Sequence, residues 1–173
     1  MNITKATEAD LEELERQLGR IPRGVVGIAA RCVCSKPLVV ATAPVLENGE
    51  PFPTVFYLSH PAIVKAASRL EADKQMETYQ DMLADLDFAA RYKKAYETYL
   101  RQREQVALQA GVEVPEAIAK VAAGGLPTRV KCLHALIGHS LASGPGVNPV
   151  GDLALEQIAQ SGEWDAKKCY CNA

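Results

Sequence analysis

The sequence predicts an α+β fold, in which a small three-stranded antiparallel meander at about residues 25–59 packs against a mostly helical remainder. Two observations favour this class. Three β-branched or aromatic runs separated by turn residues precede His60-Pro61, and apolar residues recur at helical spacing after it. The 173 residues are enough for one sizeable core, and no repeat or linker divides them. We therefore expect a single domain over residues 1–173, with a C-terminal tail from about residue 163 whose order the sequence leaves open.

The first expected element is a capped amphipathic helix. Thr7 precedes Asp10 by three residues, which is the spacing of a capping box. Apolar residues follow at helical spacing, at Leu11, Leu14 and Leu18. Gly19 is a typical helix stop, so the helix should end there.

The three expected strands come next, in residues 25–32, 37–45 and 53–58. Asn48-Gly49 lies between the second and third strands, and both residues favour the positive φ that a tight hairpin turn requires. This order predicts an antiparallel meander. The helical remainder should then follow at roughly 62–72, 74–86, 87–110, 115–123, 128–142 and 152–161.

The overall charge excludes several classes of partner. With 19 basic and 21 acidic residues the net charge is −2, so no global excess of charge would hold a nucleic acid or an anionic membrane. No apolar run approaches the roughly 18 to 20 residues of a membrane span, and the first residues lack the apolar stretch of a secretory signal. We expect a cytoplasmic protein whose five cysteines are reduced thiols or metal ligands.

Two stretches of the chain contain no Asp or Glu, one between Arg16 and Leu46 and one between Ala117 and Gly151. They carry eight basic residues, namely Arg16, Arg20, Arg23, Arg31, Lys36, Lys120, Arg129 and Lys131. If the fold brings the two stretches together, their potentials add and form a cleft for phosphate or carboxylate. Two alternatives stay open: long apolar elements simply carry little charge, or acids such as Glu71 and Asp152 pair with the arginines.

The cysteines suggest a metal site. Two pairs with one intervening residue, Cys32-Val33-Cys34 and Cys169-Tyr170-Cys171, would each point both thiols the same way in extended chain. Four thiolates suit zinc or an iron–sulfur cluster. Cys132 either joins this cluster or only packs. Buried reduced thiols, or disulfides within the pairs, are the structural alternatives.

The helix expected over residues 128–142 carries further candidates. Cys132 and His139 would lie on one side of it but two turns apart, roughly 10.5 Å along the axis, which is awkward for sharing one ion. We therefore interpret His139 as an acid–base or anion-binding group. His134 borders the apolar face and reads more readily as a core histidine. Arg129 lies near the expected helix start, where free N–H groups could hold an anion.

Several motifs resemble one known family. They are Gly19-Arg20-x-Pro22-Arg23-Gly24, Arg31-Cys32, Pro51-Phe52-Pro53-Thr54, Ser68-Arg69-Leu70-Glu71, Arg129-Val130-Lys131-Cys132-Leu133-His134, His139-Ser140-Leu141-Ala142 and Gly146-Val147-Asn148-Pro149. Together they resemble the bacterial family named domain of unknown function 501, over nearly the whole chain.

The resemblance implies a cytoplasmic protein but supplies no activity. Members are often encoded near a septum-formation initiator and an exopolyphosphatase-like protein, which implies at most a tie to division or phosphate metabolism. Cys32 and Cys132 match the family pattern, whereas Cys34, Cys169 and Cys171 depart from it. That difference favours a site built around Cys32, Cys132, His134 and His139.

Our leading hypothesis is a basic pocket for a small anionic, phosphorylated ligand. Arg20, Arg23, Arg129 and Lys131 would hold the anion, with Arg31, His134 and Asn148 as further ligand-binding residues; His139 would transfer a proton, and Cys32, Cys34, Cys132, Cys169 and Cys171 would bind a metal. One alternative is a non-catalytic protein-interaction module linked to cell division. Another is a thiol redox protein using Cys32 and Cys34. Whether the protein is an enzyme stays open.

Overall fold

A three-stranded antiparallel sheet of strand order β1-β2-β3 lies at the centre of the upper half of the molecule, in a computed structural model that describes residues 1–20 and 22–171. The strands are β1 (Val25–Arg31), β2 (Pro37–Thr42) and β3 (Phe56–Leu58). Val40 of β2 pairs with Ile28 on one side and with Tyr57 on the other. The predicted α+β class and antiparallel meander are confirmed, although β2 and β3 are shorter than the runs that predicted them.

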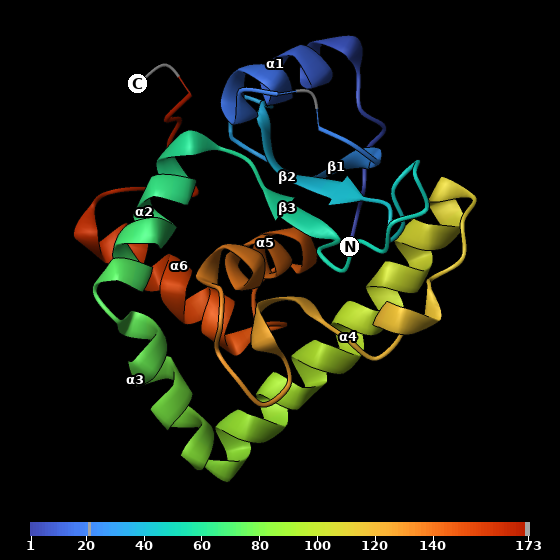
Figure 1. Cartoon of the computed structure of the whole chain (residues 1–173). Helices are drawn as coiled ribbons and strands as arrows, with labels where there is room; N and C mark the ends of the chain where they lie inside the picture. The colour runs from blue at the N-terminus through green and yellow to red at the C-terminus, as the bar shows by residue number, and fades with distance from the viewer. Residues whose placement is uncertain (21, 172–173) are drawn as a thin grey trace.

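One face of the sheet is covered by α1 (Glu8–Leu18), which lies above it in Figure 1. The predicted capping box is present: Thr7 accepts a hydrogen bond from the Asp10 backbone, and the Asp10 side chain accepts one from the Thr7 backbone. Leu14 of this helix is fully buried against Ile28 and Val40 of the sheet. The helix thus forms a small core of its own on the outer side of the sheet.

The opposite face packs on α5 (Leu133–Ser143), the central helix of the molecule (Figure 1). Gly138 allows this close approach, because a Cβ at that position would lie 2.8 Å from the carbonyl oxygen of Phe56 in β3. The helix α6 (Pro149–Ser161) packs next to α5. Any residue with a Cβ in place of Gly151 of α6 would bring that atom 2.3 Å from the carbonyl oxygen of Leu136, which is too close. Two glycines therefore fix the spacing of α5 to its neighbours on both sides.

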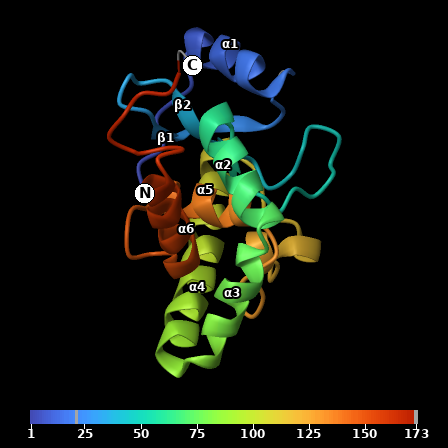
Figure 2. The same ribbon diagram turned by 90° about the vertical axis from the view of Figure 1, so that its left-hand side faces the viewer.

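The remaining helices surround α5. They are α2 (Pro61–Ala72), α3 (Gln75–Asp81), the 3₁₀ turn η1 (Met82–Ala84) and the long α4 (Leu86–Ala110). Figure 2 shows the resulting order, with α1 and the sheet above, α5, α6 and α2 in the middle, and α3 with most of α4 below. In the part of the chain that the structure describes, no helix combines the length and apolarity needed to cross a bilayer.

Of the helices expected after residue 110, one is not formed and another begins later than predicted. The segment expected to be helical at 115–123 contains only the 3₁₀ turns η2 (Glu116–Ile118) and η3 (Ala123–Gly125). The helix expected over 128–142 begins only at Leu133. Residues 129–132 lie outside the helix. Cys132 has an extended backbone, Val130 donates its N–H to the Gln80 side chain, and Lys131 donates its N–H to the carbonyl oxygen of Gly124.

The C-terminal segment packs onto the body of the protein. Trp164 is 2% exposed and belongs to the main core, and Cys171 is also buried. After α6 the chain turns back toward the β1–β2 hairpin, so that the segment up to residue 171 lies beside this hairpin (Figure 2). Segments from the two ends of the sequence therefore become neighbours in the fold.

Candidate metal centres

Four of the five cysteines gather where the C-terminal segment meets the β1–β2 hairpin. Their Sγ atoms all lie within 4.8 Å of one another, and we name them the tetrathiol group: Cys32, Cys34, Cys169 and Cys171. Within this group the Cys34 and Cys171 sulfurs lie 3.2 Å apart. Because zinc–sulfur bonds of about 2.3 Å place the four sulfurs of a tetrahedral site about 3.8 Å apart, this group could hold a metal such as zinc.

The hairpin turn presents its two cysteines through a specific backbone conformation. Ser35 adopts a positive φ of 70°, and its N–H donates to the Cys32 carbonyl oxygen at 2.8 Å. This turn lets the Lys36 N–H donate to the Cys34 sulfur, which is the largest cause lowering the pKa of Cys34 to about 7. A backbone donor at a sulfur stabilises the thiolate, which is the form that binds metal.

A second donor reaches the group from the start of α2. His60 Nδ1 accepts the Ala62 N–H, so the imidazole proton belongs on Nε2, which lies 3.3 Å from the Cys171 sulfur. Burial lowers the pKa of His60 and favours this neutral form. His60 thus offers an N–H to the sulfur while keeping no free lone pair for a metal. It supports the tetrathiol group as a neighbour of a ligand, rather than as a ligand itself.

The neighbouring sulfurs oppose the ionisation of Cys171. Burial and the neighbouring thiols raise the pKa of Cys171 well above its usual range. Four thiolates in one place repel one another unless a cation lies between them. Without a cation the four sulfurs therefore cannot all be thiolates at neutral pH, and a divalent ion between them would offset their mutual repulsion.

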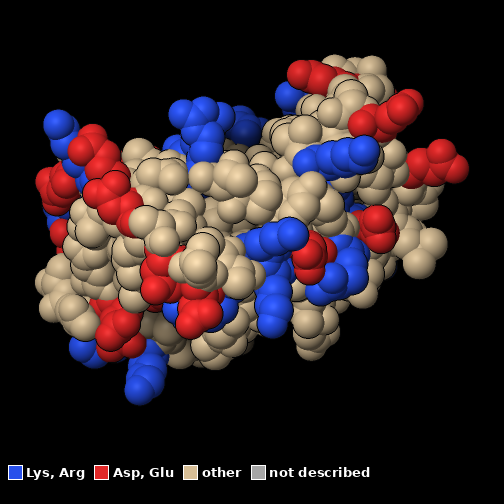
Figure 3. Space-filling view, turned by 90° about the horizontal axis from the view of Figure 1, so that it is seen from below, with Lys and Arg blue, Asp and Glu red and all other residues tan. Residues whose placement is uncertain are grey.

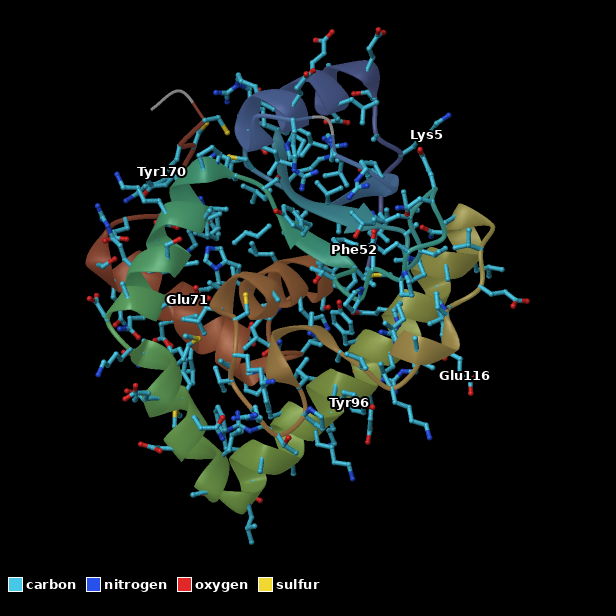
Figure 4. The ribbon with its side chains drawn as sticks, viewed as in Figure 1. Lys5, Phe52, Glu71, Tyr96, Glu116 and Tyr170 are labelled. Atoms are coloured by element: carbon cyan, nitrogen blue, oxygen red, sulfur yellow. The ribbon has the colours of Figure 1, made fainter. Side chains whose placement is uncertain are left out.

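The fifth cysteine belongs to a different group. Cys132 lies with Glu71 and His134, and the candidate ligand atoms of these three residues also fall within 4.8 Å of one another; we name them the Glu71 group. Glu71 Oε1 accepts hydrogen bonds from the Leu133 N–H at 2.7 Å and from His134 Nδ1 at 3.1 Å. Figure 4 shows Glu71 on α2 beside α5. The expected site built around Cys32, Cys132, His134 and His139 is not formed, because these residues are divided among separate places.

His134 is held at both ring nitrogens. Nδ1 faces Glu71, while Nε2 lies 3.2 Å from the Val64 carbonyl oxygen and 3.2 Å from the Ser68 hydroxyl. Contact with the Cys132 side chain, followed by Glu71, raises the pKa of His134 to about 9. The interpretation of His134 as a core histidine was wrong, since its side chain is 27% exposed and lines a cavity.

His139 occupies the core. It is 0% exposed, its ring stacks on Phe56 at 5.8 Å between centroids, and Tyr99 meets it edge-on at 5.1 Å. Asn148 Nδ2 lies 3.2 Å from Nδ1, and Gln102 Oε1 lies 3.1 Å from Nε2, which fits a neutral ring that accepts at Nδ1 and donates from Nε2. Burial lowers the pKa of His139 to about 4. This ring has no access to a solvent-borne substrate, so the proposed proton transfer has no structural support.

Asn148 is also a structural residue. It is fully buried, and its Oδ1 accepts the Gly151 N–H at 3.0 Å, which caps the start of α6. The expected ligand-binding role of Asn148 is therefore replaced by two structural ones, the helix cap and the contact with His139.

Arg31 pairs with a carboxylate inside the protein. Its guanidinium donates to both oxygens of Asp10, at 2.6 and 2.9 Å, and also to Thr4 Oγ1 and the Ser35 carbonyl oxygen. This contact is the main cause lowering the pKa of Asp10 to about 2. Arg31 is therefore engaged in joining α1 to the β1–β2 hairpin rather than facing a ligand.

The other expected anion-binding residues do not share a pocket. Arg20 and Arg23 line a small hollow of about 50 Å³ near the end of α1. Arg129 and Lys131 line a different hollow beside α3, together with the carboxylates Glu77 and Asp81. Basic and acidic side chains are likewise interspersed on the face shown in Figure 3. The two acid-free stretches do meet, but through the apolar contact of α5 with the sheet.

Sequence reasoning missed the roles of Glu71 and His60. Glu71 was considered only as a partner for an arginine, and His60 only as a residue at a strand end. Nothing in the local pattern links Glu71 to Cys132, since the two lie on different elements. The cap position of His60 before Pro61 was the one available signal, because a histidine at a helix start can accept a backbone N–H.

Comparison with known proteins places the chain in a family. No curated protein and no solved structure matches it. One family model matches residues 28–156, which is most of the chain and includes the complete Glu71 group together with Cys32 and Cys34. The chain therefore belongs to the family described as "Protein of unknown function (DUF501)".

Proposed function

We propose that this protein binds one zinc ion through the tetrathiol group, and that this ion is structural. The observation that carries the proposal is the convergence of four sulfur atoms within 4.8 Å from two segments at opposite ends of the sequence. Four thiolates fill the tetrahedral coordination shell of zinc and leave no position for a substrate. The proposed role of the ion is to hold the C-terminal segment on the β1–β2 hairpin.

The spacing of the sulfurs favours a single ion over an iron–sulfur cluster. A cluster carries its thiolates on the outside of a multi-atom core and so spreads them farther apart than a single ion does. Here the Cys34 and Cys171 sulfurs are only 3.2 Å apart. Among single ions, zinc suits a tetrahedral set of four soft thiolates and needs no redox partner.

The surroundings support an anionic zinc–thiolate centre. Four thiolates and one Zn²⁺ carry a net charge of −2, which nearby donors and cations must balance. Lys36 supplies a backbone N–H and His60 an imidazole N–H, while the Arg16 guanidinium interacts electrostatically with Cys171. Figure 4 shows Tyr170, which lies between two of the ligands, near the start of α2.

Zinc content of the purified full chain tests the proposal. Protein prepared without chelator should lose about one zinc ion per chain when Cys34→Ser is introduced, because three thiolates bind zinc more weakly than four. Val33→Ala is the matched control, since Val33 lies between two ligands and is 60% exposed. Unchanged zinc content in Cys34→Ser would refute the tetrathiolate site.

Trypsin provides an independent readout of the structural role. Lys167 and Lys168 lie in the segment that the ion would hold, and both are exposed. Cleavage there should be slow in zinc-loaded protein and much faster in Cys34→Ser, because a cleavage site must open locally before a protease can bind it. Equal cleavage rates would leave the ion without the proposed role.

One observation favours a second candidate function, a redox pair. The 3.2 Å contact joins Cys34 to Cys171, and the pKa of Cys34 is lowered to about 7. Thiol–disulfide exchange with a small disulfide would then oxidise Cys34 and Cys171 to a disulfide, rather than the pair Cys32 and Cys34. Peptide mapping of metal-free protein treated with oxidised glutathione distinguishes the two functions: a Cys34–Cys171 crosslink that zinc prevents supports a primarily structural metal site, whereas crosslinking at the same rate with zinc present supports the redox pair.

A further inference from the structure

The Glu71 group has the donors of a metal site with an open coordination position. It offers one carboxylate, one thiolate and one imidazole, whereas the tetrathiol group offers four thiolates. Zinc sites with three protein ligands keep a fourth position for water or another small ligand. The composition therefore resembles that of a site that reacts with or binds small molecules rather than one that only supports the fold.

The spacing of the ligand atoms fits one ion. Bonds of about 2.0 to 2.1 Å from zinc to nitrogen and oxygen place neighbouring ligand atoms about 3.3 Å apart in a tetrahedron. The distance from His134 Nδ1 to Glu71 Oε1 is 3.1 Å. In the metal-free protein a proton lies between these atoms, and a metal ion would replace it.

Neighbouring backbone groups orient two of the three ligands. His134 Nε2 lies 3.2 Å from the Val64 carbonyl oxygen, so the ring can donate there while Nδ1 faces the other ligands. Glu71 accepts the Leu133 N–H at 2.7 Å. Metal-binding histidines usually donate their second ring N–H to a carbonyl or carboxylate in this way. Cys132 is the N-cap residue of α5 and directly precedes Leu133 and His134, so the start of this helix places its side chain beside the other two ligands.

A cavity adjoins the group. It has a volume of about 640 Å³ and is lined by Cys132, His134, Lys65, Tyr57 and Ser59, among others. This volume is within the range of small-molecule pockets. A thiolate and a carboxylate neutralise the charge of Zn²⁺, so the Lys65 ammonium leaves the site with a net attraction for anions.

We propose that Glu71, Cys132 and His134 hold a second zinc ion whose fourth coordination position opens to this cavity and takes the oxygen of a small anion, a carboxylate or a phosphate. Water occupies the position when no anion is bound. The site shares no residue with the tetrathiol group, so the two proposals stand or fall separately.

Zinc stoichiometry separates the two sites. The wild-type chain should carry about two zinc ions, and Cys132→Ala or Glu71→Gln should each reduce the number to about one. Ser68→Ala is the matched control, because Ser68 touches His134 Nε2 but is not part of the ligand set, and it should keep both ions. A wild-type content of one ion that Cys132→Ala leaves unchanged overturns the second site. A content of one ion that Cys132→Ala removes and Cys34→Ser keeps would instead overturn the tetrathiolate proposal.

Cobalt substitution tests the open position. In a chain that carries both Cys34→Ser and Cys171→Ser and is loaded with Co²⁺, the remaining visible absorption should come from the Glu71 group, with a weak sulfur charge-transfer band because only one thiolate is present. Inorganic phosphate and acetate should each shift this spectrum, and Lys65→Gln should weaken the phosphate effect several-fold. A cobalt spectrum that neither anion changes would overturn the open position. A spectrum changed by acetate alone would limit the ligand to carboxylates.

Discussion

The tetrathiol group and the Glu71 group differ in what each would hold together. The tetrathiol group connects segments separated by 137 residues, from Cys34 to Cys171, and one of those segments is irregular. The Glu71 group connects α2 to α5, two helices that already pack on each other. A metal at the first group would therefore add a strong link to a segment that side-chain packing alone holds in place, whereas a metal at the second would add little to the existing packing of two helices.

The family match adds a second difference. Residues 28–156 include every member of the Glu71 group but only the hairpin half of the tetrathiol group. The proposed stabilising role and the proposed ligand-binding role thus fall on different parts of the chain. A cluster rich in cysteine need not be the reactive site, because four thiolates around one zinc ion would leave no coordination position for a ligand.

The largest expected effect is on stability at a fixed free-zinc concentration. Cys171→Ser should reduce the free energy of unfolding by about 4 kcal/mol if free zinc is about a thousandfold above Kd. Cys132→Ala should reduce it by about 1.4 kcal/mol if free zinc is about tenfold above the weaker Kd of a three-ligand site. Urea unfolding with buffered zinc measures both losses. Equal losses would contradict the expectation that the tetrathiol group contributes more to stability than the Glu71 group does.

The two histidines of α5 differ in their surroundings, because His134 lines a cavity and His139 lies in the core. Burial lowers the pKa of His139 to about 4 from its ordinary value of 6.5, so the unfolded chain takes up this proton first as the pH falls. The neutral His139 ring therefore contributes its full share to the free energy of unfolding above about pH 6.5. This contribution is lost progressively as the pH falls toward 4, because the unfolded chain is protonated at this histidine before the folded chain is. The loss of stability amounts to roughly 2 to 3 kcal/mol by pH 4.5.

Urea unfolding at pH 7 and pH 4.5 checks this expectation. His139→Leu should lose the corresponding part of the pH dependence, while contributions from the cysteines and from carboxylates such as Asp10 and Glu13 remain in both proteins. The variant's lower stability at pH 7 does not affect the conclusion, since only the difference between the two pH values is compared. An identical pH dependence in the two proteins would show that His139 is not buried in its neutral form.

Local patterns predicted most of the fold and half of the candidate sites. The capping box at Thr7, the strand runs and the spacing within each cysteine pair are short-range features, and each has its expected structure. The pairing of Glu71 with Cys132 could not be predicted in this way. It depends on residues 129–132 lying outside the helix, because the N–H groups of Val130 and Leu133 bond to the side chains of Gln80 and Glu71 in a sequence with helical periodicity.

The absence of acidic residues from two stretches does not indicate a basic pocket in this fold. The two acid-free stretches supply the sheet and α5, whose contact is apolar and buried. Carboxylates are missing there because burial excludes them. The arginines left in these stretches then lie at the edges of the contact, in separate surroundings.

The smallest expected difference in unfolding free energy is that between variants of Arg31 and Arg129, which lie in different acid-free stretches. Arg31→Ala should reduce the free energy of unfolding by about 2 kcal/mol, because it leaves the largely buried Asp10 carboxylate without its partner. Arg129→Ala, at an exposed position, should change it by less than about 0.5 kcal/mol. Thermal or urea unfolding of both variants measures the difference.

The same two variants should also differ in zinc binding at the tetrathiol group. Because Arg31 holds the strand that leads into Cys32 and Cys34, Arg31→Ala should weaken zinc binding there, whereas Arg129→Ala should not. If Arg129→Ala were the more damaging of the two, the acid-free stretches would have a role beyond packing.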